Sequence, residues 1–262
     1  MNRYDERRVL VTGAGSGIGQ ATVLRILAEG ASVAAADISA AGLADTVAKA
    51  GPHADRVTAV LMDVGDEQSV IEGVAQAAAA LGGLDAVVNA AGILRSSHTA
   101  TTSAAEFEHV LRVNLVGTFL VIREAIAPLR GGDAPAVVSF SSTSAQFGHP
   151  YMAAYAASKG GIQSMTHALA AEFAGDGIRF TSVQPGSIAS GMTTGETTSE
   201  ANAGPGLPDD ADYRLFAKMS PALSKGAFAG PDAVAAVVAM LASKDAYFVT
   251  GAEVRVDGGA HL

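Results

Sequence analysis

Short apolar runs rich in β-branched residues recur along the chain, and longer segments with helical character separate them. The runs number seven and read RRVLVTG, SVAAADI, RVTAVLMDV, LDAVVNAAG, AVVSFSS, RFTSVQPG and EVRVDGG. Most of them lack the alternation of apolar and polar residues that a half-exposed strand shows, which is typical of strands covered on both faces. The pattern therefore predicts seven strands, most of them buried.

The segments between the runs are long enough for helices, which we expect at 17–29, 40–50, 66–81, 103–128, 155–174 and 231–242. Strands that alternate with helices over such lengths form right-handed βαβ units. The expected fold class is α/β, with a doubly wound, seven-stranded parallel sheet flanked by helices on both faces.

The segment from about 190 to 226 lacks this alternation of strand and helix patterns. It is polar, contains glycine and proline, and has one weakly amphipathic patch from Tyr213 to Met219. A loop of this length in a compact domain is usually a lid over a binding site or a disordered insertion. Because the strand pattern returns at Glu253, we expect one domain over 1–262, with a substrate lid at about 190–226.

Charge and composition exclude several classes of function. Seventeen basic and 26 acidic residues give a net charge of -9, and no basic block occurs, so we expect no nucleic-acid partner. The absence of cysteine excludes disulfides, thiolate metal sites and a cysteine nucleophile. We also expect no metal site, because four histidines show no ligand spacing with one another or with carboxylates: His98, His109, His149 and His167.

The chain contains one apolar stretch that resembles a membrane span, at 73–94. Gln76, Asp85 and Asn89 interrupt it, and a strand pattern begins within it, so we interpret it as the end of a helix followed by a strand. The first residues, MNRYDERRVL, are charged and lack the apolar core of a signal peptide. We therefore expect a cytoplasmic protein with no membrane association.

A glycine-rich loop, VLVTGAGSGIG, ends the first predicted strand and begins the first helix. Backbone N–H groups and a helix N-terminus at this point can bind a pyrophosphate. The spacing of Gly13, Gly17 and Gly19 differs from the G-x-G-x-x-G pattern, and no Gly-Lys-Ser/Thr follows, which excludes a P-loop. By itself the loop fits either a dinucleotide site or a tight strand-to-helix turn.

An acidic residue at the end of the second strand favours the dinucleotide site. Asp37 lies 20 residues after Gly17, where a carboxylate can accept hydrogen bonds from an adenosine ribose, although a solvated loop aspartate is the alternative. Neither Ser16 nor Ile38 carries a positive charge for a 2′-phosphate. The sequence therefore favours NAD over NADP.

The segment YAASKGG places a phenol, Tyr155, four residues before an ammonium, Lys159. Residues at this spacing share a helix face whatever their role. The pair is therefore either a proton-transfer device or the polar edge of an amphipathic helix.

Five motifs in order, TGAGSGIG, NAAG at 89–92, SS at 141–142, YAASK and PG at 185–186, make the chain resemble the short-chain dehydrogenase/reductase family. The resemblance covers 7–259. It implies a Rossmann fold and an NAD-dependent oxidoreductase that acts on a secondary alcohol or its ketone. It also implies a homotetramer.

The resemblance assigns a cofactor role to many positions. The glycines would hold the pyrophosphate, Asp37 the ribose, Asp63 and Val64 the adenine, and 185–188 the nicotinamide. Ser190 stands where the family commonly has threonine, so we expect weaker positioning of the carboxamide. The implied cofactor-binding residues are Gly13, Ser16, Gly17, Ile18, Gly19, Asp37, Asp63, Val64, Asn89, Ala90, Ala91, Gly92, Tyr155, Lys159, Pro185, Gly186, Ile188 and Ser190.

The resemblance also implies four catalytic residues, Asn114, Ser142, Tyr155 and Lys159. Ser142 lies 13 positions before Tyr155, as the family requires, and is preferred to Ser141 and Ser139. It would hydrogen-bond the reacting oxygen while Tyr155 moves the proton.

Within this scheme Lys159 lowers the pKa of Tyr155 and binds the nicotinamide ribose, and Asn114 holds a water in a proton relay. A cation about 5 Å away at an effective dielectric near 20 contributes roughly 3 kcal/mol, a little over two pKa units, before desolvation opposes it. One cation can therefore fall short, whereas Lys159 and an oxidised nicotinamide together suffice.

Other functions stay open at this stage. One alternative is an NADP(H)-dependent 3-oxoacyl thioester reductase, which Asp37 disfavours. Another is a dinucleotide-sensing Rossmann protein without activity, a class that typically lacks the tyrosine and lysine. A methyltransferase with a similar first turn leaves the YAASK helix unexplained.

Overall fold

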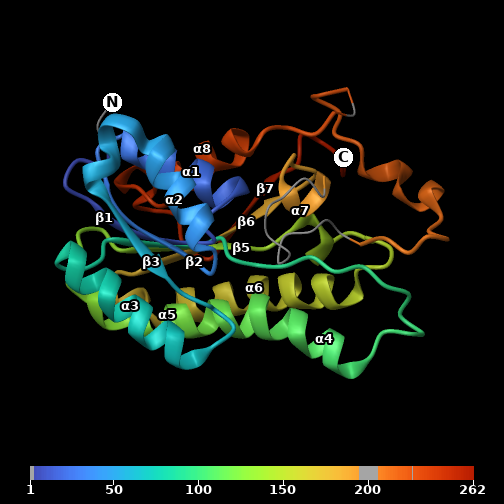
Figure 1. The fold of residues 1–262 in the computed structure, drawn as a ribbon, viewed down its shortest axis with the longest axis horizontal. Coiled ribbons are helices and arrows are strands. Elements are labelled where there is room, and N and C mark those ends of the chain that lie inside the picture. Colours follow the sequence, from blue (N-terminus) through green and yellow to red (C-terminus); the bar gives the residue numbers. More distant parts are fainter. Residues whose placement is uncertain (1–2, 195–205, 226) are drawn as a thin grey trace.

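A single parallel sheet forms the centre of the molecule (Figure 1). The computed structural model describes residues 3–194, 206–225 and 227–262. All neighbouring strands pair in parallel, in the order β3-β2-β1-β4-β5-β6-β7. The strands are β1 (Arg8–Thr12), β2 (Ser32–Asp37), β3 (Val57–Leu61), β4 (Ala86–Asn89), β5 (Ala136–Phe140), β6 (Arg179–Pro185) and β7 (Ala252–Val256).

Helices cover both faces of the sheet, which gives three layers (Figure 1). One face carries α1 (Gly17–Ala28), α2 (Ala40–Ala50) and α8 (Pro231–Leu241). The other carries α3 (Glu67–Leu81), α4 (Ala104–Leu111), α5 (Gly117–Arg130) and α6 (Ala153–Glu172). A short helix, α7 (Gly191–Thr194), and a 3-10 helix, Tyr213–Met219, follow β6. The fold is the doubly wound α/β fold that the sequence predicts.

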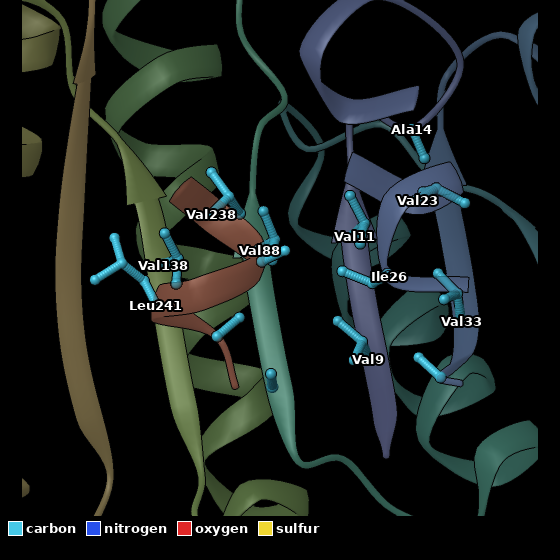
Figure 2. Packing of buried hydrophobic residues seen from close by; sticks show 14 of the residues in the cluster. Val9, Val11, Ala14, Val23, Ile26, Val33, Val88, Val138, Val238 and Leu241 are labelled. Carbon is cyan, nitrogen blue, oxygen red and sulfur yellow. The ribbon is translucent and has the colours of Figure 1, made fainter. Parts of the chain in front are cut away.

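The continuous apolar runs arise because successive strand residues point to opposite faces, both of which are covered. In β1, Val9 and Val11 belong to the cluster under α1 and α8, whereas Leu10 between them belongs to the cluster on the α3 and α5 face. Figure 2 shows Val23 and Ile26 of α1 beside the first pair. The edge strand β3 differs, since Leu61 at its end is 64% exposed, so burial on both faces holds for the central strands.

The strand order reverses direction at β1, which lies between β2 and β4. The connections after β1 and β4 therefore diverge to opposite faces and leave a crevice at the carboxyl ends of these strands. Ligands bind in open α/β sheets at such a switch point. The glycine-rich loop after β1 stands at this place.

The predicted helix at 103–128 consists of three parts. Ser103 and Glu106 form a capping box that begins α4, and a π-helical turn, Arg112–Val116, separates α4 from α5. The amide of Asn114, inside this turn, is hydrogen-bonded to the backbone of Ile93 on the neighbouring loop. A local tertiary contact thus accompanies the wider turn, and the periodicity of the sequence does not reveal it.

The apolar stretch at 73–94 contains the end of α3 and the whole of β4, as predicted. Gly82, in the left-handed region with φ 71°, ends α3. Across the three described ranges, no helix is long and apolar enough to cross a membrane.

Candidate active site

A cavity of about 610 Å³ lies at the carboxyl ends of the central strands. Its wall runs from the glycine-rich loop, past Asp37, to Tyr155 and Lys159 on α6. The sheet topology thus brings together residues that lie more than 140 positions apart in the sequence. The glycine-rich loop and the residues on α6 can therefore contact one ligand.

The glycine-rich loop needs glycine at two positions for different reasons. Gly13 has φ +67°, a conformation that side chains rarely adopt. A Cβ at Gly19 would lie 2.0 Å from the carbonyl oxygen of Gly13, so the start of α1 can approach the loop only without a side chain there. This close approach directs the N-terminus of α1 toward the cavity, where it favours an anionic ligand.

Asp37 connects the end of β2 to the glycine-rich loop. Its carboxylate accepts hydrogen bonds from the backbone N–H groups of Gly15 and Ser39, each at 2.8 Å. These contacts fix the carboxylate in the cavity wall, where its remaining lone pairs can accept hydrogen bonds from ribose hydroxyls. The next residue, Ile38, is 55% exposed and also lines the cavity.

The wall beyond Asp37 contains Asp63 and Val64, as the resemblance implies. Asp63 accepts a hydrogen bond from the N–H of Gly65 at 2.8 Å. Arg112 also lines this part and donates from Nε to the carbonyl of Gly65 at 2.8 Å. No motif indicates Arg112, which lies in the π-helical turn after α4 and reaches the cavity through this contact.

Tyr155 lines the cavity beside Ser142, whose hydroxyl interacts with the phenol. Burial raises the pKa of Tyr155 to about 12, and the Ser142 hydroxyl opposes this rise. The protein's own groups therefore favour the phenol over the phenolate. A general base at this position needs additional positive charge close to the ring.

Lys159 is the nearest source of that charge. Its Nζ lies 5.6 Å from the centroid of the Tyr155 ring and donates to the carbonyl of Phe140 at 2.8 Å. Burial lowers the pKa of Lys159 to about 8, so the ammonium form still predominates at pH 7. In the protein by itself burial raises the pKa of Tyr155, and the expected joint effect of Lys159 and an oxidised nicotinamide stays a prediction.

The three candidate serines have different partners. Ser141 donates to the carbonyl of Lys159 at 2.9 Å, and Ser139 accepts a hydrogen bond of 3.4 Å from Asn89. Ser142 is the one of the three that influences the pKa of Tyr155. Its role in catalysis stays a prediction.

Asn114 is fully buried and does not line the cavity. Its Oδ1 accepts from Ile93 N–H at 2.8 Å, and its Nδ2 donates to Ile93 C=O at 2.9 Å and to Ser158 Oγ at 3.1 Å. A Cβ at Gly92 would lie 3.0 Å from Asn114 Oδ1 and 3.5 Å from Lys159 Nζ. Asn114 therefore connects the loop after β4 with α6. Its Oδ1 and the Nζ of Lys159 both lie close to Gly92.

The cavity wall also contains residues that no motif indicates. They are Leu94, Arg95, His149, Met152, Met192 and Met219. Of the predicted amphipathic patch only Met219 lines the cavity, because Tyr213 and Leu215 are more than half exposed and Phe216 stacks on Tyr151 with centroids 6.2 Å apart.

Residues 7–201 match the family model described as short chain dehydrogenase. The chain belongs to the short chain dehydrogenase family. A relative of this short chain dehydrogenase is the 3-oxoacyl-(acyl-carrier-protein) reductase FabG of Thermotoga maritima, with 34% identity over 98% of either chain. The match spans nearly the whole length, so the family assignment applies to the entire domain.

Two solved structures resemble this short chain dehydrogenase closely. One is a short chain dehydrogenase from Mycobacterium paratuberculosis bound to NAD, with a TM-score of 0.88, 28% identity and 98% of each chain covered. The other is a short chain dehydrogenase from Burkholderia cenocepacia J2315 in complex with NADP, with a TM-score of 0.85, 30% identity and 100% of each chain covered. Together they support a nicotinamide dinucleotide as the cofactor. They do not distinguish NAD from NADP, so that choice has to be argued from the residues around Asp37.

The residues to which the family resemblance assigns a cofactor role lie close together in this short chain dehydrogenase, since all but Asn89 line the cavity. Asn89 is buried beneath it, with its Nδ2 directed to Ser139, so its contribution is to hold β4 against β5. Within the described part of the chain, no group of three or more histidine, aspartate and glutamate side chains could hold a metal ion.

Proposed function

We propose that this short chain dehydrogenase transfers a hydride between NAD(H) and a secondary alcohol or its ketone, with Tyr155 as the general acid and base. The observation that carries the proposal is the placement of Tyr155, Ser142 and Lys159 on the same cavity as the glycine-rich loop and Asp37. Kinetics with a panel of secondary alcohols and NAD, followed by the absorbance of NADH, tests it.

The cavity residues fit such a cofactor. The glycine-rich loop has no room for side chains at Gly13 and Gly19, which leaves backbone N–H groups for a pyrophosphate. Asp37 would hold the adenosine ribose and Lys159 the nicotinamide ribose. When bound, the nicotinamide ring supplies hydride chemistry and, in its oxidised form, a positive charge.

In alcohol oxidation, the hydroxyl of Ser142 holds the substrate oxygen and Tyr155 accepts the hydroxyl proton as the carbinol carbon loses its hydride. In ketone reduction, Tyr155 donates that proton back. The positive charge of Lys159 stabilises the phenolate form of Tyr155, which accepts the proton in oxidation and remains after the proton is donated in reduction. We propose that Asn114, which approaches Lys159 beside Gly92, holds a water that returns the proton to solvent.

A second candidate function is an NADP(H)-dependent 3-oxoacyl thioester reductase. The relationship to FabG favours it, since that protein is a 3-oxoacyl reductase. Asp37 argues against it, because its carboxylate lies in the cavity wall and would repel a 2′-phosphate. A dinucleotide sensor without activity is the least supported function, because the serine, tyrosine and lysine are all present at the cavity.

We predict that the enzyme discriminates strongly between the two cofactors through Asp37. Two like charges about 4 Å apart at an effective dielectric near 20 repel by roughly 4 kcal/mol, so kcat/KM for NAD should exceed that for NADP by at least about 10²-fold. Asp37→Ser should reduce this ratio at least about 10-fold. Asp55→Ser, which removes an exposed carboxylate from the turn after α2, should leave it unchanged. Comparable efficiency of the wild-type enzyme with both cofactors contradicts the assignment of NAD.

We further propose that the segment at about 190–226 acts as a substrate lid. Residues 195–205 and Gly226 of this segment lie outside the described residues. The described part supports the proposal, because Met219 lines the cavity and its carbonyl accepts a hydrogen bond of 3.4 Å from the hydroxyl of Ser187.

The lid proposal predicts a substrate effect at Met219. Met219→Ala should raise KM for the preferred alcohol by about 3- to 10-fold through lost apolar contact, with the affinity for NAD nearly constant. The matched control is Leu215→Ala, at a 54% exposed position on the same 3-10 helix that does not line the cavity. Equal KM values in the two variants contradict a lid role for this part of the segment.

We propose a homotetramer, as the family resemblance implies. Exposed aromatic side chains at two places on the surface support it. Phe119 on α5 is 44% exposed, and Tyr247 and Phe248, just before β7, are 74% and 90% exposed. Aromatic side chains at such exposure are typical of surfaces that another chain covers.

A further inference from the structure

His149 lines the substrate side of the cavity and belongs to no motif of the family resemblance. It lies on the loop between Ser142 and α6, next to a buried hydroxyl. Its Nε2 is 3.3 Å from Oγ1 of Thr143, and the same Oγ1 is 3.4 Å from the carbonyl oxygen of Pro185. Thr143 is 1% exposed, so these two atoms are its hydroxyl's partners in the described structure.

This arrangement fixes the tautomer of the imidazole. A carbonyl oxygen can only accept, so the single hydroxyl proton of Thr143 is donated to Pro185. Thr143 Oγ1 then accepts from His149, which places the ring proton on Nε2. In a neutral ring Nδ1 is consequently a hydrogen-bond acceptor.

The neutral form of His149 predominates near pH 7. Burial, with the nearby His261 as a smaller cause, lowers the pKa of His149 to about 4. The ring of His261 stacks on His149 with centroids 5.7 Å apart and donates toward Asp257, 3.2 Å away. On its other side His261 stacks on Phe147 at 4.2 Å, beneath the guanidinium of Arg255.

Across residues 3–194, 206–225 and 227–262, Nδ1 of His149 forms no hydrogen bond, and it is not among the buried polar atoms that lack a partner. It is therefore accessible, on a ring that lines the same cavity as Leu94, Met152 and Met219. An acceptor without a protein partner beside apolar side chains favours a ligand that brings a donor.

We infer that Nδ1 of His149 accepts a hydrogen bond from a second hydroxyl of the substrate, so that the preferred substrates are diols and their hydroxyketone products. The inference rests on the proposed alcohol oxidation and specifies its substrate class. The reaction is balanced: one carbinol loses its hydride to NAD and its hydroxyl proton to Tyr155, and becomes a ketone. The second hydroxyl keeps its proton, which it donates to His149. An acceptor-only group at that position, such as the second carbonyl of a diketone, gains nothing from Nδ1.

The experiment compares matched pairs of alcohols at pH 7.5 with NAD. The pairs are butane-2,3-diol with butan-2-ol and pentane-2,4-diol with pentan-2-ol, which cover two spacings of the second hydroxyl. In the wild-type enzyme kcat/KM for the diol should exceed that for the monoalcohol at least about 10-fold in one of the pairs. In the reverse direction 3-hydroxybutan-2-one should be reduced more efficiently than butane-2,3-dione.

Three variants assign the preference to the ring nitrogen. His149→Phe keeps an aromatic ring for the stack but has no acceptor, and its diol-to-monoalcohol ratio should fall to within about 3-fold of unity. His149→Gln offers an amide oxygen and should restore part of the ratio. His53→Phe replaces a histidine on the turn after α2, whose Nδ1 lies 2.9 Å from Arg56, and should keep the wild-type ratio.

The outcomes separate the two proposals. Oxidation of the monoalcohols without a diol preference, or a preference that His149→Phe retains, overturns the inference and leaves the proposed function intact. No oxidation of any of the four alcohols by the folded wild-type enzyme overturns both. The NADH affinity of each variant, measured by the increase in NADH fluorescence, should stay within about 3-fold of wild type and shows that the cofactor half of the cavity is intact.

Discussion

Replacing Tyr155 by phenylalanine should lower kcat at least about 10²-fold while the dissociation constant for NADH changes less than about 3-fold. The substitution removes the transferable proton and keeps the ring, Lys159 and the wall of the cavity. The fold should persist, because the change removes one hydroxyl that lines the cavity and keeps the packing of the ring.

The measurement is single-turnover and steady-state oxidation of a secondary alcohol, with circular dichroism to confirm folding. Tyr213→Phe is the matched control, since it removes the same hydroxyl from a side chain that is 69% exposed. It should keep wild-type turnover. A Tyr155→Phe enzyme with near-normal kcat shows that the phenol has a structural role only.

The pH dependence of the wild-type enzyme provides a second test of the same role. Burial raises the pKa of Tyr155 to about 12, so below that pH the free protein holds mainly the protonated phenol. Because alcohol oxidation needs the phenolate, its rate should rise with pH and should still be rising at about pH 9, and ketone reduction, which needs the phenol, should not rise. Tyr155→Phe should abolish this rise.

Replacing Gly19 by alanine should weaken NADH binding at least about 10²-fold. The new Cβ would lie 2.0 Å from the carbonyl oxygen of Gly13, and a backbone atom cannot move aside as a flexible side chain can. The N-terminus of α1 must therefore shift away from the loop, which displaces the N–H groups that would bind the pyrophosphate. Overpacking of this kind typically also lowers the free energy of unfolding by about 1–3 kcal/mol.

Titration of NADH fluorescence measures the affinity, and the absence of tryptophan from the chain keeps the signal clear of energy transfer from indole. The control is Gly175→Ala, where a Cβ would meet nothing within 4 Å and φ is not positive. This variant should bind NADH like the wild type. Unaltered affinity in Gly19→Ala would falsify the role of this close approach in cofactor binding.

The sequence alone predicted the fold because each strand and helix has a strong local pattern. The bounds of α2 agree with the expectation at both ends, and those of α3 differ by one residue at its start. Burial of the central strands on both faces makes their apolar runs continuous, so the parallel sheet could be recognised without a template. The helix at 103–128 was predicted as one element because the π-turn at Asn114 leaves the helical periodicity almost unchanged.

The motifs of the family resemblance indicated most residues of the candidate site, among them Gly13, Asp37, Tyr155 and Lys159. Their spacing alone left the roles open, because a lysine one helical turn after a tyrosine shares its helix face whatever its role. The pKa of Tyr155 could not be predicted in the same way. It depends on how deeply the folded protein buries the ring and on the neighbouring hydroxyl of Ser142.

Only the tertiary structure determined the substrate side of the cavity. His149 comes from a loop without regular spacing, and His261, near the C-terminus, reaches it across more than 100 residues of sequence. The tautomer of His149 depends on Thr143 and on the carbonyl of Pro185, at the end of another strand. Local sequence patterns report the period of a helix or strand and the glycines that a turn requires. Contacts between distant loops leave no such period, because they form only after the sheet has brought the carboxyl ends of its strands together.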